Sequence, residues 1–217
     1  MSRISEPTVR RLSHYYRVLE EVAAEGRRMI SSALLAEREG VTSAQVRKDL
    51  SAFGTFGRRG LGYPVEHLRG GIRALLGLDR RWRTCVVGAG HIGTALAGYR
   101  GFADQGFDIQ ALFDADPDRV GRTLGGLVVR AVTQLSARDG FEIGVIATPA
   151  RAAQEVADAL VAAGVAGILN FAPRKLHVPE GMAVRDVDMT MEFESLSYAL
   201  SHARPVRPRP GRDRARA

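Results

Sequence analysis

The sequence predicts an α/β protein in which a small helical domain precedes a doubly wound parallel sheet. In the first third of the chain, apolar residues recur at the three- and four-residue spacing of helices with one buried face. From Thr84 onward, short apolar runs alternate with helical stretches, which is typical of a parallel sheet with crossover helices. With 217 residues, 45% of them hydrophobic, the chain is long enough for two small cores. We expect a domain over residues 1–80, a second over 81–187, a helix at 188–203 and a disordered Arg- and Pro-rich tail at 204–217.

The helical domain begins with three predicted helices. The first covers residues 9–25, and the second lies between a Ser-Ser cap and a glycine at 31–40. Thr42, with Gln45 three residues later, fits a capping box at the start of a third helix over residues 42–53. Two short helices joined by a tight turn, after a longer helix, are typical of a helix-turn-helix unit.

One face of the third helix is polar and basic, and this face predicts contact with DNA. Its apolar residues recur at positions i, i+4 and i+7 and would face the core, so the polar face remains open. Glutamine and arginine side chains can hydrogen-bond base edges, whereas a lysine neutralises phosphate. An exposed polar face without a partner is the alternative interpretation. The candidate DNA-binding residues of this helix are Ser43, Gln45, Arg47, Lys48 and Ser51.

The charge distribution also indicates a polyanionic partner for the first domain. Residues 1–83 hold 16 Lys and Arg against 9 Asp and Glu, whereas residues 84–203 hold 9 against 14. The segment GTFGRRGLGYP at 54–64 predicts a winged hairpin with Arg58 and Arg59 at its tip. Two guanidinium groups on a narrow projection suit a DNA minor groove, and contact with phosphates alone is the alternative.

A glycine-rich turn follows the first predicted strand of the second domain. The apolar run Thr84–Val87 is followed by G-x-G-x-x-G and then by a helical stretch, which is the order that a Rossmann dinucleotide turn requires. The first glycine would permit the tight turn, the second would let the backbone reach a diphosphate, and the third would allow close packing of helix on strand. The diphosphate would lie on the N–H groups of the helix start. The candidate binding residues of this turn are Gly88, Ala89, Gly90, His91, Ile92 and Gly93.

An acidic residue, Asp114, ends the next predicted strand. It lies about 20 residues beyond the turn, where a dinucleotide site has the carboxylate that accepts hydrogen bonds from the adenosine ribose. A carboxylate there also repels a 2′-phosphate, so the pattern favours NAD(H) over NADP(H). A turn that is rich in glycine for packing alone is the alternative.

Further apolar runs complete the predicted sheet. Because ligands of such sheets bind at the carboxyl ends of the strands, Thr148, Pro149 and Asn170 are expected on the same rim as the glycine-rich turn. The last helix carries an apolar face, and the pattern is equally consistent with packing on a partner subunit and on its own sheet. The further strands are expected at 127–132, 143–147, 165–171 and 182–186, with a helix at 151–163.

Several classes of function lack support in the sequence. The single cysteine, Cys85, lies in a predicted strand and the histidines are scattered, so we expect no metal site. No apolar run is long enough to span a membrane and the N-terminus lacks a signal-peptide core, which predicts a cytoplasmic protein. None of the five histidines lies in a catalytic pattern, so we expect neither catalytic residues nor an enzyme.

The chain resembles the Rex family of redox-sensing transcriptional repressors from about residue 9 to residue 203. The resemblance rests on AQVRKDLS at 44–51 and on the segments GTFGRRGLGY, CVVGAGHIGTALAGY, FDADPDRVG and ILNFAP. It implies a homodimer that binds operator DNA through two winged-helix domains. It also implies that NADH binding releases the DNA, with NAD⁺ competing poorly, so that the protein responds to the NADH/NAD⁺ ratio.

The resemblance further implies roles for individual residues. The glycine-rich turn would hold the diphosphate, Asp114 the adenosine ribose, and Thr148 and Pro149 the path to the nicotinamide. The last helix would be swapped onto the other subunit. The residues Arg17, Tyr99 and Asp188 would form a switch between the domains, although Asp188 also fits a simple helix cap.

One position departs from the family pattern. Met189 lies where some members carry an aromatic residue against the nicotinamide, so ring-on-ring contact is not expected here. An apolar pocket built partly from Met189 and Phe193 of the partner subunit would instead disfavour the charged ring of NAD⁺ by desolvation. A Rossmann dehydrogenase and a constitutive DNA-binding protein with a structural nucleotide are the two rival classes.

Overall fold

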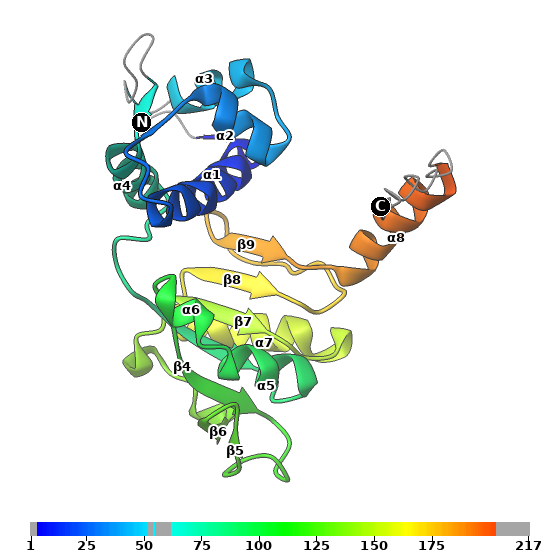
Figure 1. Ribbon diagram of the computed structural model, residues 1–217. Helices are drawn as coiled ribbons and strands as arrows, with labels where there is room; N and C mark the ends of the chain where they lie inside the picture. Colours follow the sequence, from blue (N-terminus) through cyan, green and yellow to red (C-terminus); the bar gives the residue numbers. More distant parts are fainter. Residues whose placement is uncertain (1–3, 52–53, 55–61, 203–217) are drawn as a thin grey trace, which may run out of the picture. The chain divides into compact units, whose positions relative to one another are not determined.

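The computed structural model describes residues 4–51, 54 and 62–202 of the chain. They form two compact units, one of the described residues within 4–81 together with Ala103–Gly106, and one of Trp82–Phe102 together with residues 107–202 (Figure 1). Three predictions lie outside the described residues: the end of the third helix near Phe53, the hairpin tip with Arg58 and Arg59, and the tail.

The described residues of the first unit form helices and one short antiparallel strand pair. The three predicted helices are present, and Ile30 of one strand pairs with Tyr63 of the other. The elements are α1 (Glu6–Ala24), β1 (Met29–Ile30), α2 (Ser32–Glu39), α3 (Ser43–Ser51), β2 (Tyr63–Pro64) and α4 (Val65–Leu75).

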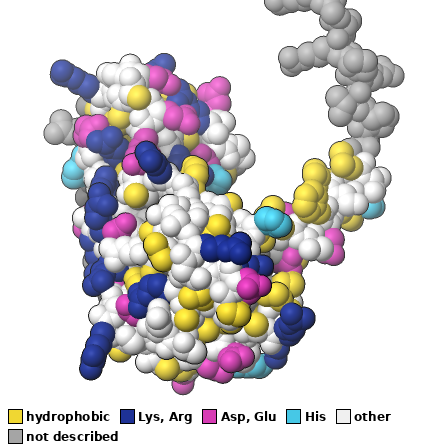
Figure 2. Space-filling model, turned by 90° about the horizontal axis from the view of Figure 1, so that it is seen from below, with side chains coloured by type: hydrophobic (Ala, Val, Ile, Leu, Met, Phe, Trp, Pro, Cys, Tyr) yellow, Lys and Arg dark blue, Asp and Glu magenta, His cyan; other side chains and the backbone are white. Residues whose placement is uncertain are grey.

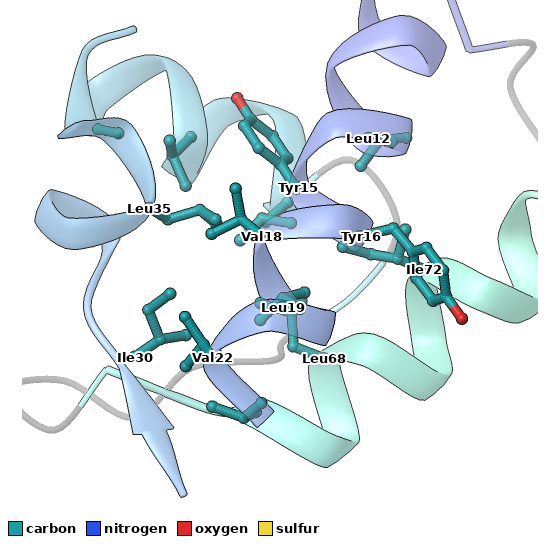
Figure 3. Close-up of a cluster of buried hydrophobic side chains, with 14 residues drawn as sticks. Leu12, Tyr15, Tyr16, Val18, Leu19, Val22, Ile30, Leu35, Leu68 and Ile72 are labelled. Atoms are coloured by element: carbon teal, nitrogen blue, oxygen red, sulfur yellow. The ribbon is translucent and has the colours of Figure 1, made fainter. Parts of the chain in front are cut away.

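The core of this unit lies between α1 and the other helices. Leu12 and Leu19 of α1 are fully buried, as are Leu35 of α2 and Leu68 and Ile72 of α4. Figure 3 shows these side chains packed together around α1. The apolar face that the spacing predicts along each helix therefore packs against the other helices of this unit.

The caps that the sequence predicts for the two short helices are partly confirmed. Ser31 Oγ accepts a hydrogen bond from the Leu34 N–H at 3.1 Å, and Gly40 ends α2 with a φ of +66°. At α3, Thr42 Oγ1 accepts from the Gln45 N–H at 3.1 Å. The second half of the predicted capping box is wrong, because among the described residues the Thr42 N–H makes no hydrogen bond to the Gln45 side chain, whose Nε2 donates to Asp49.

A buried carboxylate joins α3 to α1. Asp49 is 3% exposed and accepts hydrogen bonds from Arg11 Nε at 2.6 Å and Arg11 Nη2 at 2.7 Å. It also accepts from the Tyr15 hydroxyl at 2.9 Å and from Gln45 Nε2 at 2.8 Å. Burial acts to raise the pKa of Asp49, but the hydrogen bonds from Arg11, Gln45 and Tyr15 outweigh it and the pKa is lowered.

The second unit is a seven-stranded sheet in the order β5-β6-β4-β3-β7-β8-β9. All neighbours pair in parallel except β5, which pairs with β6 in antiparallel fashion at one edge. Without β5, this is the strand order of a Rossmann sheet. The strands are β3 (Trp82–Val87), β4 (Phe107–Asp114), β5 (Thr123–Leu124), β6 (Leu127–Ala131), β7 (Ile143–Ile146), β8 (Gly167–Asn170) and β9 (Ala183–Asp186).

Two helices cover opposite faces of this sheet. Val86 of β3 shares a cluster with Leu96 of α5 (His91–Gly98), whereas Val87 shares one with Leu160 of α7 (Ala150–Ala162). Figure 1 shows these helices against the strands. The predicted alternation of strand and helix is only partly correct, because the described connections from β4 to β6 and from β8 to β9 contain no helix. The remaining helical segments are α6 (Gly101–Asp104), η1 (Val132–Gln134) and η2 (Ala137–Asp139).

The last helix, α8 (Met189–His202), has no buried residue. Its large apolar side chains are between 54% and 69% exposed, and Figure 2 shows hydrophobic side chains uncovered along it. The alternative that this helix packs on its own sheet therefore has no support in the structure. The exposed residues are Met189, Met191, Phe193, Leu196, Tyr198 and Leu200.

We expect Asp49→Ala to lower the free energy of unfolding of the first unit by about 3 kcal/mol, because it leaves Arg11 without its buried partner. Tyr15→Phe removes one hydrogen bond to the carboxylate and should cost about 1 kcal/mol. Since the folded pKa of Asp49 lies below its ordinary value of 3.8, this stabilisation is complete above that pH and is lost as the pH falls through the folded pKa. Urea unfolding at pH 7 and in acid measures both effects, and equal stability of Asp49→Ala and the unaltered chain would contradict the prediction.

Candidate functional site

A pocket of about 900 Å³ opens where the strand order of the sheet reverses, between β3 and β7. Ligands of open parallel sheets bind at this point, beyond the carboxyl ends of the strands. It is lined by the turns after β3, β4, β7 and β8, by the start of η1 and by one face of α7. Its lining includes Gly88, Gly90, His91, Ile92, Asp114, Asp116, Arg119, Thr133, Thr148, Pro149, Arg151, Glu155 and Phe171.

The three glycines of the turn each meet a different constraint. Gly88 has a φ of +108°, and a Cβ there would lie 2.5 Å from the carbonyl oxygen of Ala147. A Cβ on Gly93 would overlap the carbonyl oxygen of Gly88, so only glycine allows α5 to lie this close to β3. Gly90 faces the pocket, where the nearest atom to an added Cβ is Nη1 of Arg119 at 4.0 Å. The turn therefore leaves backbone N–H groups at the start of α5 open to an anion.

Asp114 lines the pocket at the end of β4 but is already engaged. Its Oδ2 accepts from the Ala89 N–H at 2.6 Å and from Arg119 Nη1 at 3.1 Å, and its Oδ1 accepts from the Asp116 N–H at 2.9 Å. Burial acts to raise the pKa of Asp114, but the hydrogen bonds from Asp116, Ala89 and Arg119 outweigh it and the pKa is lowered. The group is therefore an anion that joins the glycine-rich turn to the turn after β4.

The wall after β7 contains a polar atom without a partner. Thr148 Oγ1 is buried and has no hydrogen-bond partner among the described residues. Leaving a buried hydroxyl unpaired costs about 1–3 kcal/mol, so this hydroxyl of the pocket lining would be stabilised by a hydrogen bond to a bound molecule. Pro149 follows as the N-cap of α7. Asn170, which the sequence placed on the same rim, is buried and bonds Asp186 at 2.8 Å, so it is not a free ligand group.

The candidate DNA-binding residues of α3 differ in how freely they are presented. Arg47, Lys48 and Ser51 are exposed, with Arg47 Nη1 donating to Ser32 Oγ at 3.2 Å. Ser43 is half-buried. Gln45 is also half-buried, with its amide N–H held by Asp49. The sequence reasoning missed Asp49, although an acidic residue four positions after Gln45 in a basic helix was a signal that the face is partly internal.

The three predicted switch residues are divided between the two units. Arg17 is exposed on α1, whereas Tyr99 and Asp188 belong to the sheet unit. Tyr99 is 61% exposed and makes an edge contact with Phe102 at 5.0 Å between ring centroids. Asp188 Oδ1 accepts from the Thr190 N–H at 2.9 Å, which is the helix cap that its sequence position allowed. Their joint action stays a prediction.

Other chemistry has little support among the described residues. They contain no group of three or more His, Cys, Asp or Glu side chains placed to hold a metal ion. Cys85 is fully buried, and burial raises the pKa of its thiol to about 12, so it is not a reactive thiolate. In the same described part, no helix is long and apolar enough to cross a membrane.

Two family models match the chain. One, described as a CoA binding domain, matches residues 79–174, and the other, described as a putative DNA-binding protein N-terminus, matches residues 3–51. The first covers the sheet and the pocket as far as the end of β8. The second covers α1, α2 and α3.

Relatives match over nearly the full length. The redox-sensing transcriptional repressor Rex of Syntrophomonas wolfei is 47% identical over 202 residues, covering 92% of this chain and 96% of the relative. Rex of Streptomyces coelicolor is 48% identical over 198 residues, covering 90% of this chain and 77% of the relative. Rex of Thermus aquaticus is 46% identical over 200 residues, covering 91% of this chain and 94% of the relative.

Solved structures agree in fold. RSP, a Rex-family repressor, in complex with β-NAD⁺ and operator DNA has a TM-score of 0.88 and 37% identity, covering 93% of this chain and 94% of that chain. RSP in complex with β-NADH has a TM-score of 0.83 and 36% identity, covering 93% of this chain and 96% of that chain. These full-length matches are to transcriptional repressors, which decides against the dehydrogenase alternative. From its paired helix-turn-helix and dinucleotide-binding units and from these matches, the chain belongs to the Rex family of redox-sensing transcriptional repressors.

Proposed function

We propose that this chain binds operator DNA as a homodimer and releases it when NADH binds, in response to the cellular NADH/NAD⁺ ratio. The observation that carries the proposal is the glycine-rich turn at the β3–β7 crossover, in a chain that also presents basic residues on the second helix of a helix-turn-helix unit. The RSP structures support it, because one holds NAD⁺ together with operator DNA and another holds NADH.

Residues of the pocket would hold three parts of the dinucleotide. The diphosphate would lie on the N–H groups at the start of α5, beside Gly90. A carboxylate accepts about four hydrogen bonds, and Asp114 already accepts three, so one place on Oδ1 remains for an adenosine ribose hydroxyl. The unpaired hydroxyl of Thr148 and the ring of Pro149 would border the nicotinamide half.

The basic face of α3 would enter the DNA major groove. Arg47, Lys48 and Ser51 are open to phosphates and base edges. Gln45 would act differently from a free glutamine, because its N–H₂ group donates to Asp49 and its Oε1 remains as an acceptor. It would therefore accept a hydrogen bond from an exocyclic amine of adenine or cytosine instead of bonding adenine through two atoms.

The exposed face of α8 supports a homodimer in which this helix is swapped onto the other subunit. Large apolar side chains left in water over a whole helix mark an interaction surface. The partner's Met189 and the partner's Phe193 would then border the nicotinamide and disfavour the charged ring of NAD⁺ by desolvation. NADH and DNA would each favour a different placement of the subunits, through Arg17, Tyr99 and Asp188, and such coupling is reciprocal.

A gel shift with DNA from upstream of the protein's own coding region, titrated with NADH or NAD⁺, tests the function. NADH is expected to weaken DNA binding by at least about fivefold, the lower range of allosteric coupling, and NAD⁺ to leave it nearly unchanged. Lys48→Ala should weaken binding in every nucleotide state and lower the salt slope by about one, whereas Arg138→Ala in the sheet unit should do neither. Equal release by NAD⁺ and NADH rules out redox sensing, and DNA binding that ignores NADH favours a constitutive DNA-binding protein.

We expect Thr148→Val to separate nucleotide binding from stability. The substitution removes an unpaired buried hydroxyl, so the free protein should become more stable, while NADH affinity should fall about fivefold to tenfold through the lost hydrogen bond. Thr84→Val is the matched control, because the Thr84 hydroxyl is satisfied by the Trp82 carbonyl oxygen at 3.1 Å and lies outside the pocket. Thermal unfolding without NADH measures the stability of the free protein, and the increase in Tm on adding NADH reports the NADH affinity. Unchanged NADH affinity in Thr148→Val would remove this residue from the site.

The double variant Leu196→Glu and Leu200→Glu is expected to be monomeric, because it places charges on the apolar face of α8 that a partner subunit would bury. Ser197→Glu adds a charge to the same helix without removing an apolar side chain and should remain dimeric. Sedimentation velocity at micromolar concentration distinguishes the two. A dimer that survives the double substitution would show that the subunits associate elsewhere.

A further inference from the structure

Arg119 lies at the adenosine end of the pocket between two carboxylates. Its Nη1 is 3.1 Å from Asp114 Oδ2, and its Nε is 3.4 Å from Asp116 Oδ2. All three side chains line the pocket, and the guanidinium lies over the glycine-rich turn, 4.0 Å from where a Cβ on Gly90 would be. Arg119 is thus held between the group that would bind the ribose and a second acid.

An arginine in this position is the residue type that binds the 2′-phosphate of NADP(H) in Rossmann sites. A guanidinium can grip a phosphate with two parallel hydrogen bonds, provided its N–H groups are free to turn toward it. Here Nη1 donates a hydrogen bond to Asp114 Oδ2, and Nε lies 3.4 Å from Asp116 Oδ2 in an ion pair. The sequence therefore contains an arginine suited to a 2′-phosphate. In the structure, two carboxylates lie against its guanidinium.

The charge balance of the three side chains is unfavourable for a 2′-phosphate. One guanidinium between two carboxylates leaves a net charge of about −1, and a phosphate monoester adds about −2 at pH 7. Each carboxylate lies within 3.4 Å of the guanidinium, well inside the Debye length of about 8 Å, so salt screens their effect on a neighbouring anion only in part. Asp114 alone is insufficient to set this balance, because Arg119 cancels its charge.

We propose that Asp116 is a specificity-determining residue that keeps the pocket selective for NADH over NADPH by holding and neutralising Arg119. The proposal rests on the proposed nucleotide site. Asp116 is suited to this role because its other oxygen, Oδ1, accepts from the Asp118 N–H at 3.0 Å, which fixes the carboxylate in the turn after β4. If Asp116 loses its charge, Nε of Arg119 loses its ion-pair partner, and the summed charge of Asp114, Arg119 and residue 116 becomes zero.

Asp116→Asn tests the proposal, because an asparagine oxygen can still accept from the Asp118 N–H while the charge is lost. Dissociation constants for NADH and for NADPH are measured by titration of the full-length protein. We expect NADPH to bind at least about tenfold more tightly than to the unaltered chain, as removal of one nearby charge implies, with NADH changed by less than about twofold. Thermal unfolding of the free variant verifies that it is folded.

Two control variants make the result specific. Asp118→Asn removes the same charge two residues away, from an exposed side chain that does not line the pocket, and should leave the ratio of the two affinities unchanged. Asp116→Asn combined with Arg119→Ala should abolish the gain, because the gain depends on the freed guanidinium. An unchanged ratio in Asp116→Asn, or an equal gain in Asp118→Asn, overturns the proposal. Failure of the unaltered chain to bind NADH overturns the proposed function as well, and is thereby distinguished from failure of this inference alone.

Discussion

The sheet unit depends on the close approach of α5 to β3. At Gly93 there is no room for a Cβ, because the carbonyl oxygen of Gly88 occupies its place, and Gly88 itself turns at a φ of +108° beside Ala147. These contacts place the start of α5 directly beyond the ends of β3 and β7. The open N–H groups, the pocket and the position of Asp114 across the turn all follow from that approach.

Both units use a buried carboxylate to hold a functional element in place. Asp49 fastens α3 to α1 through Arg11 and Tyr15, and Asp114 fastens the glycine-rich turn to the turn after β4. Burial alone would raise the pKa of each acid, but multiple hydrogen bonds keep both as anions. Burial raises the pKa of Tyr15, and its bond to Asp49 adds to this, so Tyr15 remains a protonated donor. A buried charge of this kind favours one arrangement over others more than it adds stability.

The same pairing of a carboxylate with an arginine has a second consequence at the nucleotide pocket. Arg119 is a cation in a site expected to receive an anionic diphosphate, yet it is neutralised by Asp114 and Asp116. In the proposed site, the N–H groups at the start of α5 would supply positive potential for the diphosphate. At the C-terminal end of the unit, α8 exposes an apolar face, and under the proposed function a second subunit would cover it and complete the nicotinamide half. In this proposal, cofactor selectivity would depend on Arg119 and its two carboxylates, and dimerisation on α8.

Local patterns were sufficient to predict most elements, and they failed where a side chain had two partners to choose from. The glycine spacing, the caps at Ser31 and Gly40 and the apolar runs of the strands depend on neighbours in the chain, so they could be read directly. Gln45 was predicted to complete a capping box, but its side chain donates to Asp49, which is buried against Arg11 of a distant helix. The contact of Gln45 with DNA stays a prediction. Likewise, the sequence supplied Asp114, Asp116 and Arg119 as three separate charges. Only the folded chain brought the three charges and the unpaired hydroxyl of Thr148 to one pocket, because strand order, which local patterns do not contain, decides which turns become neighbours.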